Sequence, residues 1–459
     1  MIRIYAVDEA EQDILRRGDV LSPAVPEALR VALRRVFGED LSPATAVARI
    51  LADVRHRGDA ALRSWTRQID GSAPAEVAVR REELEAAVAA IPVKVADALQ
   101  LAAERIWAFH SQQPLTSWST GELGGRLGQR ITPLRRVGVY VPGGTAPLPS
   151  SLLMSAIPAQ VAGVPEIIVT TPPGRASGRV PDIILAAAHI AGIEHVYKAG
   201  GAQAIAAMAF GTETIARVDK VVGPGNLFVT LAKKQVYGLV GIDGLYGPTE
   251  TVVIADDTAD AGWVAADLLA QAEHDVLATA ILLTPSRPLA EAVQVEVARQ
   301  VEQLSRAEVI AASLAERGGI VLTADLDEAA RLADDFAPEH LCIATTNAAE
   351  LAGKIHRAGG IFIGERSFEV LGDYVAGPSH VMPTGGTARF ASPLSAVDFV
   401  RITSIVELDD ATSRQLSQAA AILAEAEGLD GHANAAKKRL GIGPFDFAQG
   451  KDWRLETGD

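Results

Sequence analysis

The sequence predicts an α/β protein with two similar doubly wound parallel-sheet domains, flanked by helical N- and C-terminal segments. Over residues 137–248, short apolar runs alternate with alanine-rich helical patterns. The same rhythm repeats over residues 249–394. Strand, helix and strand in regular succession is typical of parallel βαβ units. Residues 1–136 and 395–459 have mainly helical patterns, so we expect four parts in all.

The predicted strands are apolar runs that mostly end in glycine, proline or polar turns. They are RVGVYVP, PEIIVTTPP, HVYKAGG and KVVGPGN in the first domain and TVVIAD, AILLTP, GIVLTAD, HLCIATT and GGIFIG in the second. The predicted helices of the first domain are SSLLMSAIPAQVAG, PDIILAAAHIAG and AQAIAAMAFG. We expect the N-terminal helical segment to pack with the second α/β domain. We expect the C-terminal segment to end in a loosely held tail.

Composition excludes several classes of protein. Hydrophobic residues make up 48% of the 459 residues and the net charge is −15, which is typical of a folded acidic protein and disfavours nucleic-acid binding. The single cysteine, Cys342, excludes a disulfide framework and a cysteine-rich zinc site. The long uncharged stretch 137–165 is interrupted by prolines, which a membrane helix does not tolerate. With no export signal in the N-terminal sequence, we expect a soluble cytoplasmic protein.

Three glycine-rich turns follow strands of the first domain, at residues 139–145, 198–204 and 221–226. Ligands of doubly wound sheets bind where strands end and loops diverge. Glycine lets the backbone approach a phosphate closely, and a helix that starts after such a turn favours an anion. None of the three is a complete dinucleotide fingerprint, and similar turns are common in α/β proteins. Dinucleotide binding and ordinary turns therefore both remain open.

The second domain and the C-terminal segment contain polar pairs at helix faces, strand ends and loops. Each pair can also be explained without a function, as core, surface or turn residues. Together, glutamine, aspartate and histidine form a mixed oxygen and nitrogen ligand set that suits zinc without thiolates. The residues alone thus indicate a metal-assisted enzyme for a small polar substrate. The pairs are Gln271 with His274, Glu339 with His340, Asp373 with His380, and Glu427 with His432.

The order of these motifs along the chain resembles the histidinol dehydrogenase family. The series is GVYVPGG, GGAQAIAAMAFGT, GPGN, GPTETVVIAD, LLAQAEHD, APEHL, GDYVAGPSHVMPTGG and EGLDGHANA. Each motif is weak alone, but the ordered set covers nearly the whole chain and is very specific. The resemblance implies two incomplete Rossmann-like domains and an NAD-dependent oxidation of L-histidinol through histidinal to L-histidine, the last step of histidine biosynthesis.

The resemblance also assigns roles residue by residue. The zinc ligands, for one ion per subunit, would be Gln271, His274, Asp373 and His432. The catalytic pair would be Glu339 and His340. Residues around NAD would be Tyr140, Gln203 and Asn226. The zinc ligands and catalytic pair would also contact the substrate, together with Thr249, His380 and Glu427.

The family's chemistry implies that His340 takes the hydroxyl proton while Glu339 activates the water that adds to the aldehyde. The family is a domain-exchanged homodimer, so Glu427 and His432 would complete the partner's site. Thr249 stands where the family usually has serine, which keeps the hydroxyl and adds a methyl group. Two alternatives remain: a related zinc and NAD enzyme for another alcohol, such as a sulfopropanediol, and a non-catalytic nucleotide- or metal-binding protein.

Overall fold

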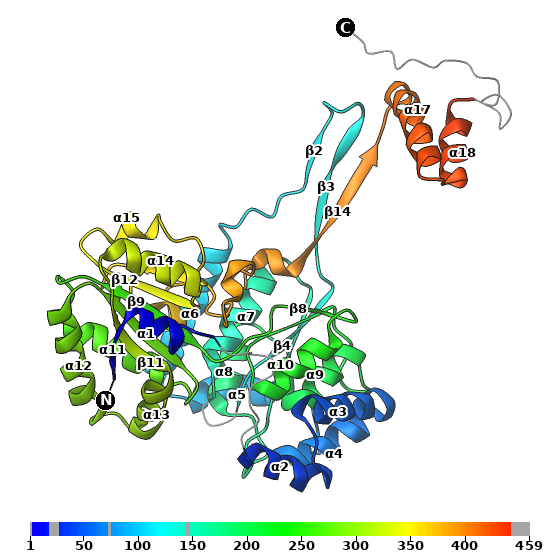
Figure 1. The fold of residues 1–459 in the computed structure, drawn as a ribbon. Helices are drawn as coiled ribbons and strands as arrows, with labels where there is room; N and C mark the ends of the chain where they lie inside the picture. The colour runs from blue at the N-terminus through cyan, green and yellow to red at the C-terminus, as the bar shows by residue number, and fades with distance from the viewer. Residues whose placement is uncertain (1, 18–26, 72–74, 144–146, 442–459) are drawn as a thin grey trace. The chain divides into compact units, whose positions relative to one another are not determined.

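The computed structural model describes residues 2–17, 27–71, 75–143 and 147–441, and the chain divides into two compact units. Unit 1 comprises residues 1–113 and 133–399, and unit 2 comprises residues 114–132 and 400–459. Figure 1 labels the elements of both units. The predicted tail GPFDFAQGKDWRLETGD, together with Gly144 and Thr145 of the first glycine turn, lies outside the described residues.

A six-stranded parallel sheet in unit 1 has the order β1-β11-β10-β9-β12-β13. Alternate residues of its strands face two separate cores: Val253 and Cys342 face one, and Val252 and Leu341 face the other. Helices therefore cover both faces, which explains why the central strands are almost wholly apolar. The strands are β1 (Ile4–Ala6), β9 (Glu250–Ala255), β10 (Thr279–Thr284), β11 (Gly318–Leu322), β12 (His340–Ala344) and β13 (Gly360–Ile363). The helices are α11 (Ala261–Ala272), α12 (Arg287–Val301), α13 (Ala307–Arg317), α14 (Leu326–Phe336) and α15 (Ala348–Ala352).

A five-stranded parallel sheet, also in unit 1, has the order β6-β5-β4-β7-β8. In this sheet, β5 and β6 lie on one side of β4, and the later strands β7 and β8 lie on the other side. In the six-stranded sheet, β10 and β11 likewise lie on one side of β9, and β12 and β13 lie on the other. The strand order therefore reverses between β4 and β7 and between β9 and β12. The two sheets confirm the predicted α/β class. The strands are β4 (Arg136–Tyr140), β5 (Glu166–Thr171), β6 (His195–Lys198), β7 (Lys220–Val222) and β8 (Gly241–Ile242). The helices are α7 (Pro149–Val161), α8 (Asp182–Ile190), α9 (Gly201–Phe210) and α10 (Leu227–Val236).

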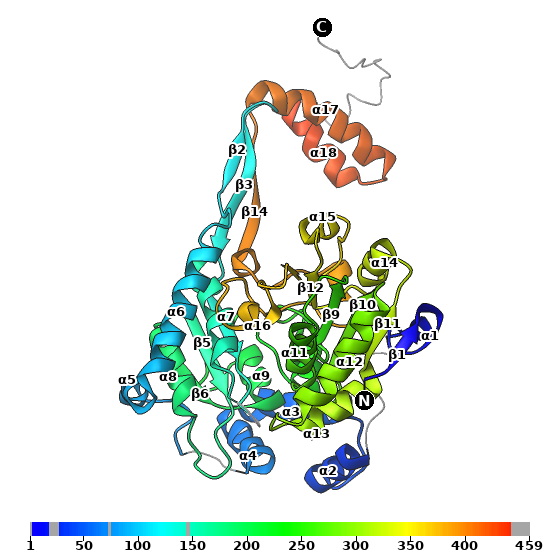
Figure 2. The ribbon, with the colours of Figure 1, turned by 90° about the vertical axis from the view of Figure 1, so that its left-hand side faces the viewer.

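The N-terminal helices pack against the five-stranded half of unit 1, which corrects the expected packing with the second α/β domain. Helix α3 contacts α9 and α10, α5 contacts α8, and α6 contacts α7 (Figure 2). The apolar stripe of α3, including Val47 and Ile50, shares a core with Ile205 and Met208 of α9. The chain up to Leu15, with β1 and α1, instead joins the six-stranded sheet and its cores. The helices are α1 (Val7–Gln12), α2 (Glu27–Phe37), α3 (Pro43–Arg57), α4 (Asp59–Asp70), α5 (Arg81–Ala90) and α6 (Val93–His110).

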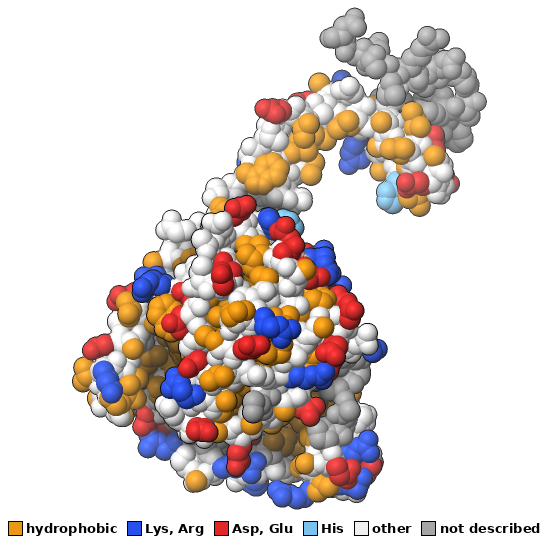
Figure 3. Space-filling model, turned by 60° about the vertical axis from the view of Figure 1, so that its left-hand side comes forward, with side chains coloured by type: hydrophobic (Ala, Val, Ile, Leu, Met, Phe, Trp, Pro, Cys, Tyr) orange, Lys and Arg blue, Asp and Glu red, His pale blue; other side chains and the backbone are white. Residues whose placement is uncertain are grey.

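Unit 2 combines a three-stranded sheet, ordered β14-β3-β2, with two helices that pack on each other. The three strands lie within residues 1–136 and 395–459, which were expected to be mainly helical. Apolar side chains lie exposed along the strands and on α17, as orange atoms in Figure 3 show, and they include Trp118, Ile402, Val406 and Leu423. The elements are β2 (Trp118–Thr120), β3 (Arg126–Pro133, whose last residue is in unit 1), β14 (Val400–Glu407), α17 (Asp410–Ala426) and α18 (Asp430–Arg439).

Short elements complete the part of unit 1 that follows β13. They are α16 (Glu369–Tyr374) and the 3-10 helices Thr387–Arg389 and Ala396–Phe399. Within the described ranges no single helix is long and apolar enough to cross a membrane, while α5 and α6 together meet the same criterion with a bend of 115° between them.

Candidate active site

Glu339 and His340 lie where strands of the six-stranded sheet begin, not where they end. Glu339 directly precedes β12 and His340 is its first residue, while Thr249 directly precedes the neighbouring strand β9. The Thr249 hydroxyl donates to Glu339 Oε2 over 2.6 Å, and the backbone N–H of Glu250 donates to the same oxygen over 3.1 Å. Gln271 Nε2 donates in turn to the Thr249 hydroxyl over 2.9 Å. This chain of bonds fixes the Glu339 carboxylate at the edge of the sheet.

The His340 imidazole is surrounded by carboxylates. Its Nδ1 lies 3.6 Å from Glu369 Oε1 and 3.9 Å from Glu339 Oε2, and its Nε2 lies 3.7 Å from Asp373 Oδ1. Neither ring nitrogen has a hydrogen-bond partner among the described residues. Burial lowers the pKa of His340 to about 4, although Asp373 opposes the shift. The imidazole is therefore neutral at physiological pH and able to accept a proton.

The carboxylates around His340 are themselves desolvated. Burial raises the pKa of Glu339 and of Glu369 well above the usual range, and neighbouring acids add to the effect. Among the described residues, no lysine or arginine forms an ion pair with Glu339, Glu369 or Asp373. Uncompensated buried carboxylates are unfavourable without a cation. The edge is therefore suited to binding a positively charged ligand.

Two of the predicted zinc ligands lie at the C-terminal end of α11. Gln271 is in its last turn and is fully buried, and its Oε1 has no hydrogen-bond partner within the described part of the chain. His274 lies two residues beyond the last residue of the helix and is close enough to His340 and His380 to lower their pKa values. Asp373 comes from α16. The described residues hold no ready-formed group of three or more His, Cys, Asp and Glu side chains for a metal. An orphaned amide oxygen, a carboxylate and an imidazole nevertheless suit zinc chemically.

His380 joins the two halves of unit 1. Its Nδ1 contacts the backbone oxygen of Asp373 at 2.8 Å, and its Nε2 contacts the hydroxyl of Ser151 on α7 at 3.2 Å. Next to it, Ser379 donates to the backbone oxygen of Met154, also on α7, over 3.0 Å. The loop after α16 thus brings the carboxylate-rich edge to the helix that follows β4.

The residues predicted around NAD follow the carboxyl ends of the five-stranded sheet. Tyr140 ends β4, and its hydroxyl accepts the N–H of Gly201 over 3.2 Å. Gln203 is fully buried in the first turn of α9; its Nε2 donates to Asp70 over 3.2 Å, and its Oε1 has no partner among the described residues. Asn226 follows β7 and caps α10 by accepting the N–H groups of Phe228 and Val229. All three lie at helix N-termini or strand ends that favour an anion.

The turn between β7 and α10 is held by a buried ion pair. Gly223 has φ of +111°, and a Cβ there would meet the backbone oxygen of Tyr140 at 2.2 Å, so only glycine fits. Its N–H donates to Asp243 over 2.7 Å, and Lys233 Nζ donates to its carbonyl over 3.0 Å. Lys233 and Asp243 also pair directly and are almost fully buried. The sequence analysis missed this pair, because the two residues stand alone in the sequence without a motif.

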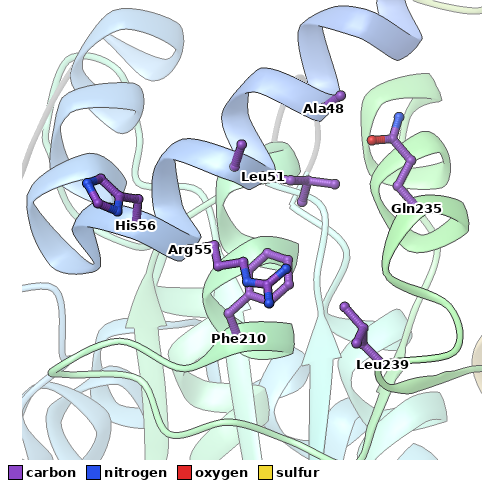
Figure 4. Close-up of a pocket in the computed structure, with 8 residues that line it drawn as sticks. Ala48, Leu51, Arg55, His56, Phe210, Gln235 and Leu239 are labelled. Atoms are coloured by element: carbon purple, nitrogen blue, oxygen red, sulfur yellow. The ribbon is translucent and has the colours of Figure 1, made fainter.

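Glu427 and His432 belong to unit 2, and both are exposed there. Glu427 follows the last residue of α17, and His432 is in the first turn of α18. Sequence reasoning missed Glu369, although its spacing of four residues from Asp373 places both on one helix face. A pocket of about 490 Å³ between α3, α9 and α10 contains none of the predicted site residues (Figure 4).

Known proteins of one family match nearly the whole chain. The family model for histidinol dehydrogenase matches residues 35–440. A histidinol dehydrogenase of Deinococcus radiodurans is 54% identical over 418 residues, which cover 91% of this chain and 95% of the relative. One of Dehalococcoides mccartyi is 48% identical over 441 residues, with 96% and 99% covered. The crystal structure of the enzyme from Elizabethkingia anophelis matches with a TM-score of 0.87 at 33% identity, over 96% of this chain and 98% of that one. The chain belongs to the histidinol dehydrogenase family.

Proposed function

We propose that this protein oxidises L-histidinol through histidinal to L-histidine, with reduction of NAD in each step. The observation that carries the proposal is the buried edge at which a neutral imidazole lies among Glu339, Glu369 and Asp373. Histidinol carries an amine that is protonated at neutral pH, so its charge complements this edge. Family membership supplies the reaction, and the edge supplies groups that fit it.

Two proton acceptors at the edge match the two oxidation steps. In the alcohol step, His340 Nε2 takes the hydroxyl proton while the C–H electron pair leaves as hydride, for which bound NAD is the acceptor. In the aldehyde step, a water must add to the carbonyl before the second hydride can leave. Glu339 is held by the Thr249 hydroxyl and the Glu250 N–H through one oxygen. A cation bound at this edge would favour its ionised form, so its other oxygen would remain for that water's proton.

The zinc site we propose consists of Gln271, His274 and Asp373, together with His432. Zinc would supply a Lewis-acidic centre that orients the imidazole and amine of the substrate. The buried Oε1 of Gln271, which has no partner among the described residues, fits an oxygen ligand. His380, hydrogen-bonded to the backbone of Asp373 and to Ser151, would hold the substrate against this site.

The cofactor site we propose lies within residues 137–248, and the catalytic site within residues 249–394. Tyr140 ends β4, Gln203 follows β6 and Asn226 follows β7, so all three lie at the carboxyl edge of one sheet. Glycine turns and helix N-termini at this edge suit a pyrophosphate. A cytoplasmic location remains a prediction.

We further propose a homodimer in which unit 2 of one subunit completes the site of its partner. Unit 2 buries few side chains and exposes Ile402, Val406 and Leu423, which in water favours association. Glu427 and His432 are exposed and so remain free to contact a partner. Mixing His432→Ala chains with His340→Ala chains should then restore part of the activity. Failure after verified subunit exchange would favour a site built within one chain.

The activity is tested by following NAD reduction with purified protein and L-histidinol, with a sulfopropanediol as the alternative substrate. We expect two NADH per histidinol and no reaction with the sulfopropanediol. Chelation of zinc should abolish the activity, and His274→Ala should lower zinc content and turnover together. A His274→Ala enzyme with full zinc and full rate would remove this residue from the metal site.

A further inference from the structure

Glu369 is a buried carboxylate that the proposed mechanism does not yet use. It is the first residue of α16, only 2% of its surface is exposed, and its Oε2 accepts a hydrogen bond from the Thr251 hydroxyl. Thr251 lies on β9 directly opposite His340 on β12, in the register of the parallel pair. A hydrogen bond thus holds the Glu369 carboxylate against β9, beside the His340 imidazole.

The other oxygen of Glu369 is nearer to His340 Nδ1 than the Glu339 carboxylate is. Oε1 lies 3.6 Å from Nδ1, whereas Glu339 Oε2 lies 3.9 Å away and already accepts two hydrogen bonds. On the opposite side of the ring, Nε2 faces Asp373, which we place at the zinc site. Hydrogen bonds of catalytic groups are often long in ligand-free structures and shorten when substrate binds.

We propose that Glu369 is a positioning residue that holds His340 with its proton on Nδ1, so that Nε2 accepts the proton of the substrate. The inference deepens the proposed function and rests on it. A neutral imidazole carries one proton on either nitrogen, and the partner of one nitrogen decides which form is present. Burial favours the protonated acid, but a cation bound at this edge would favour the ionised carboxylate, which only accepts and therefore selects the Nδ1–H form. It also stabilises the imidazolium that forms when Nε2 takes the hydroxyl proton.

A double-mutant cycle distinguishes positioning from a structural role. Glu369→Gln is isosteric and can still bond with the Thr251 hydroxyl, so the fold should persist. We expect kcat to fall about 10- to 10²-fold for both histidinol and histidinal, with KM for histidinol changed less than about twofold. His340→Asn alone should lower kcat by about 10²–10⁴-fold. In the His340→Asn background, Glu369→Gln should cause no further loss, because its effect passes through His340.

A second variant and a control complete the test. Thr251→Val removes the hydroxyl that anchors Glu369, so it should give a smaller loss that also disappears in the His340→Asn background. Glu365→Gln, which changes an acid on the loop before α16 that accepts the Asp260 N–H, should leave kcat unchanged. Zinc content should match that of the unaltered enzyme in every variant.

Several results would overturn the inference. Full activity of Glu369→Gln, a further loss in the His340→Asn background, or a loss of zinc with the Glu369 substitution would each do so. Failure of the proposed function looks different. If His340→Asn oxidises histidinol normally, the assignment of the base is wrong whatever the Glu369 variant does.

Discussion

The two parallel sheets of unit 1 present opposite edges to their proposed ligands. In the five-stranded sheet, Tyr140, Gln203 and Asn226 come where strands end and helices begin. In the six-stranded sheet, Thr249, Glu339 and His340 come where strands begin, and Gln271 comes where helix α11 ends. Helices in βαβ units run antiparallel to the strands, so one edge collects helix N-termini and the other collects helix C-termini.

The kind of helix terminus at each edge matches the charge of the ligand proposed for that edge. Helix N-termini carry partial positive charge and glycine turns expose N–H groups, which suits the pyrophosphate of a dinucleotide. Helix C-termini carry partial negative charge, and here they stand beside buried carboxylates, which suits zinc and an ammonium group. We therefore propose that opposite edges of two similar sheets supply an anion site and a cation site in one unit.

Glu339→Gln, at the edge of the six-stranded sheet, should have the largest effect on turnover. The amide can still accept the Thr249 and Glu250 bonds, so the fold should persist, but it cannot accept a proton from water. We expect histidinal oxidation to slow by about 10²–10⁴-fold and histidinol oxidation to slow much less. Single-turnover rates with each substrate measure the two steps separately. Equal losses in both steps would contradict separate roles for Glu339 and His340.

Asn226→Asp tests the anion-binding edge with an intermediate effect. Aspartate caps a helix as well as asparagine does, so α10 should keep its N-cap and the protein its thermal midpoint. The new charge faces the proposed phosphate site and the amide donor is lost, so KM for NAD should rise about tenfold or more, with a smaller change in kcat. Ser286→Ala, at the N-cap of α12, is the matched control: it should cost about 1 kcal/mol of stability without altering KM. An unchanged KM in Asn226→Asp would leave Asn226 with its capping role alone.

Asp70 is a desolvated acid on the cofactor side, and its titration should appear in stability. Burial raises its pKa to about 6, with Arg175 opposing, so the folded state binds a proton that the unfolded state releases near pH 4. The contribution of Asp70 to the free energy of unfolding is therefore complete below about pH 4. It is lost as pH rises through 6, which lowers the free energy of unfolding by about 1–3 kcal/mol.

Thermal midpoints of the unaltered protein and Asp70→Asn, measured from pH 4 to 8, should reveal this contribution as a difference that grows in favour of the variant with pH. Asp53→Asn gives a flat contrast over this range, because hydrogen bonds from Arg57 lower the pKa of Asp53, so its contribution is complete above about pH 4 and is lost only at lower pH. A pH-independent difference for Asp70→Asn would show that its pKa is not raised.

The sequence predicts most of the sheet architecture because the buried strands are short apolar runs. The runs assigned to β4, β5, β6, β7, β9, β10, β11, β12 and β13 are all strands in the structure. The strands that sequence reasoning missed lack that signal: β14 alternates with polar residues and is largely exposed, and β8 has two residues. The pairing partner of β14 is also distant in the sequence, as the Arg126–Glu407 contact between β3 and β14 shows.

The sequence predicts the site residues as separate pairs, but it does not predict which pairs come together in the fold. Thr249 and Glu339 are 90 residues apart and meet because β9 and β12 are neighbours, although β10 and β11 come between them in the chain. This adjacency depends on where the strand order reverses, which no local pattern encodes. The predicted roles of Gln271, His274, Asp373, His432 and the other site residues stay predictions that the variants above address.

Substitution of Cys342 should have the smallest effect, although Cys342 lies two residues after His340, the proposed base. A thiolate could attack an aldehyde and pass a thiohemiacetal to NAD, which would replace the water-addition step. The packing argues against this: Cys342 shares a face of β12 with His340, but it lies further along the strand, where it packs with Val253 and Leu282 in a helix-covered core. Only 5% of its surface is exposed, and burial raises the pKa of its thiol well above the usual range, so it remains protonated and inert. Cys342→Ala should therefore retain near-normal turnover on histidinol and histidinal, with at most a modest fall in the thermal midpoint from the small cavity. A variant that still makes histidinal but fails to oxidise it would show that the thiol, and not a water activated by Glu339, is the nucleophile.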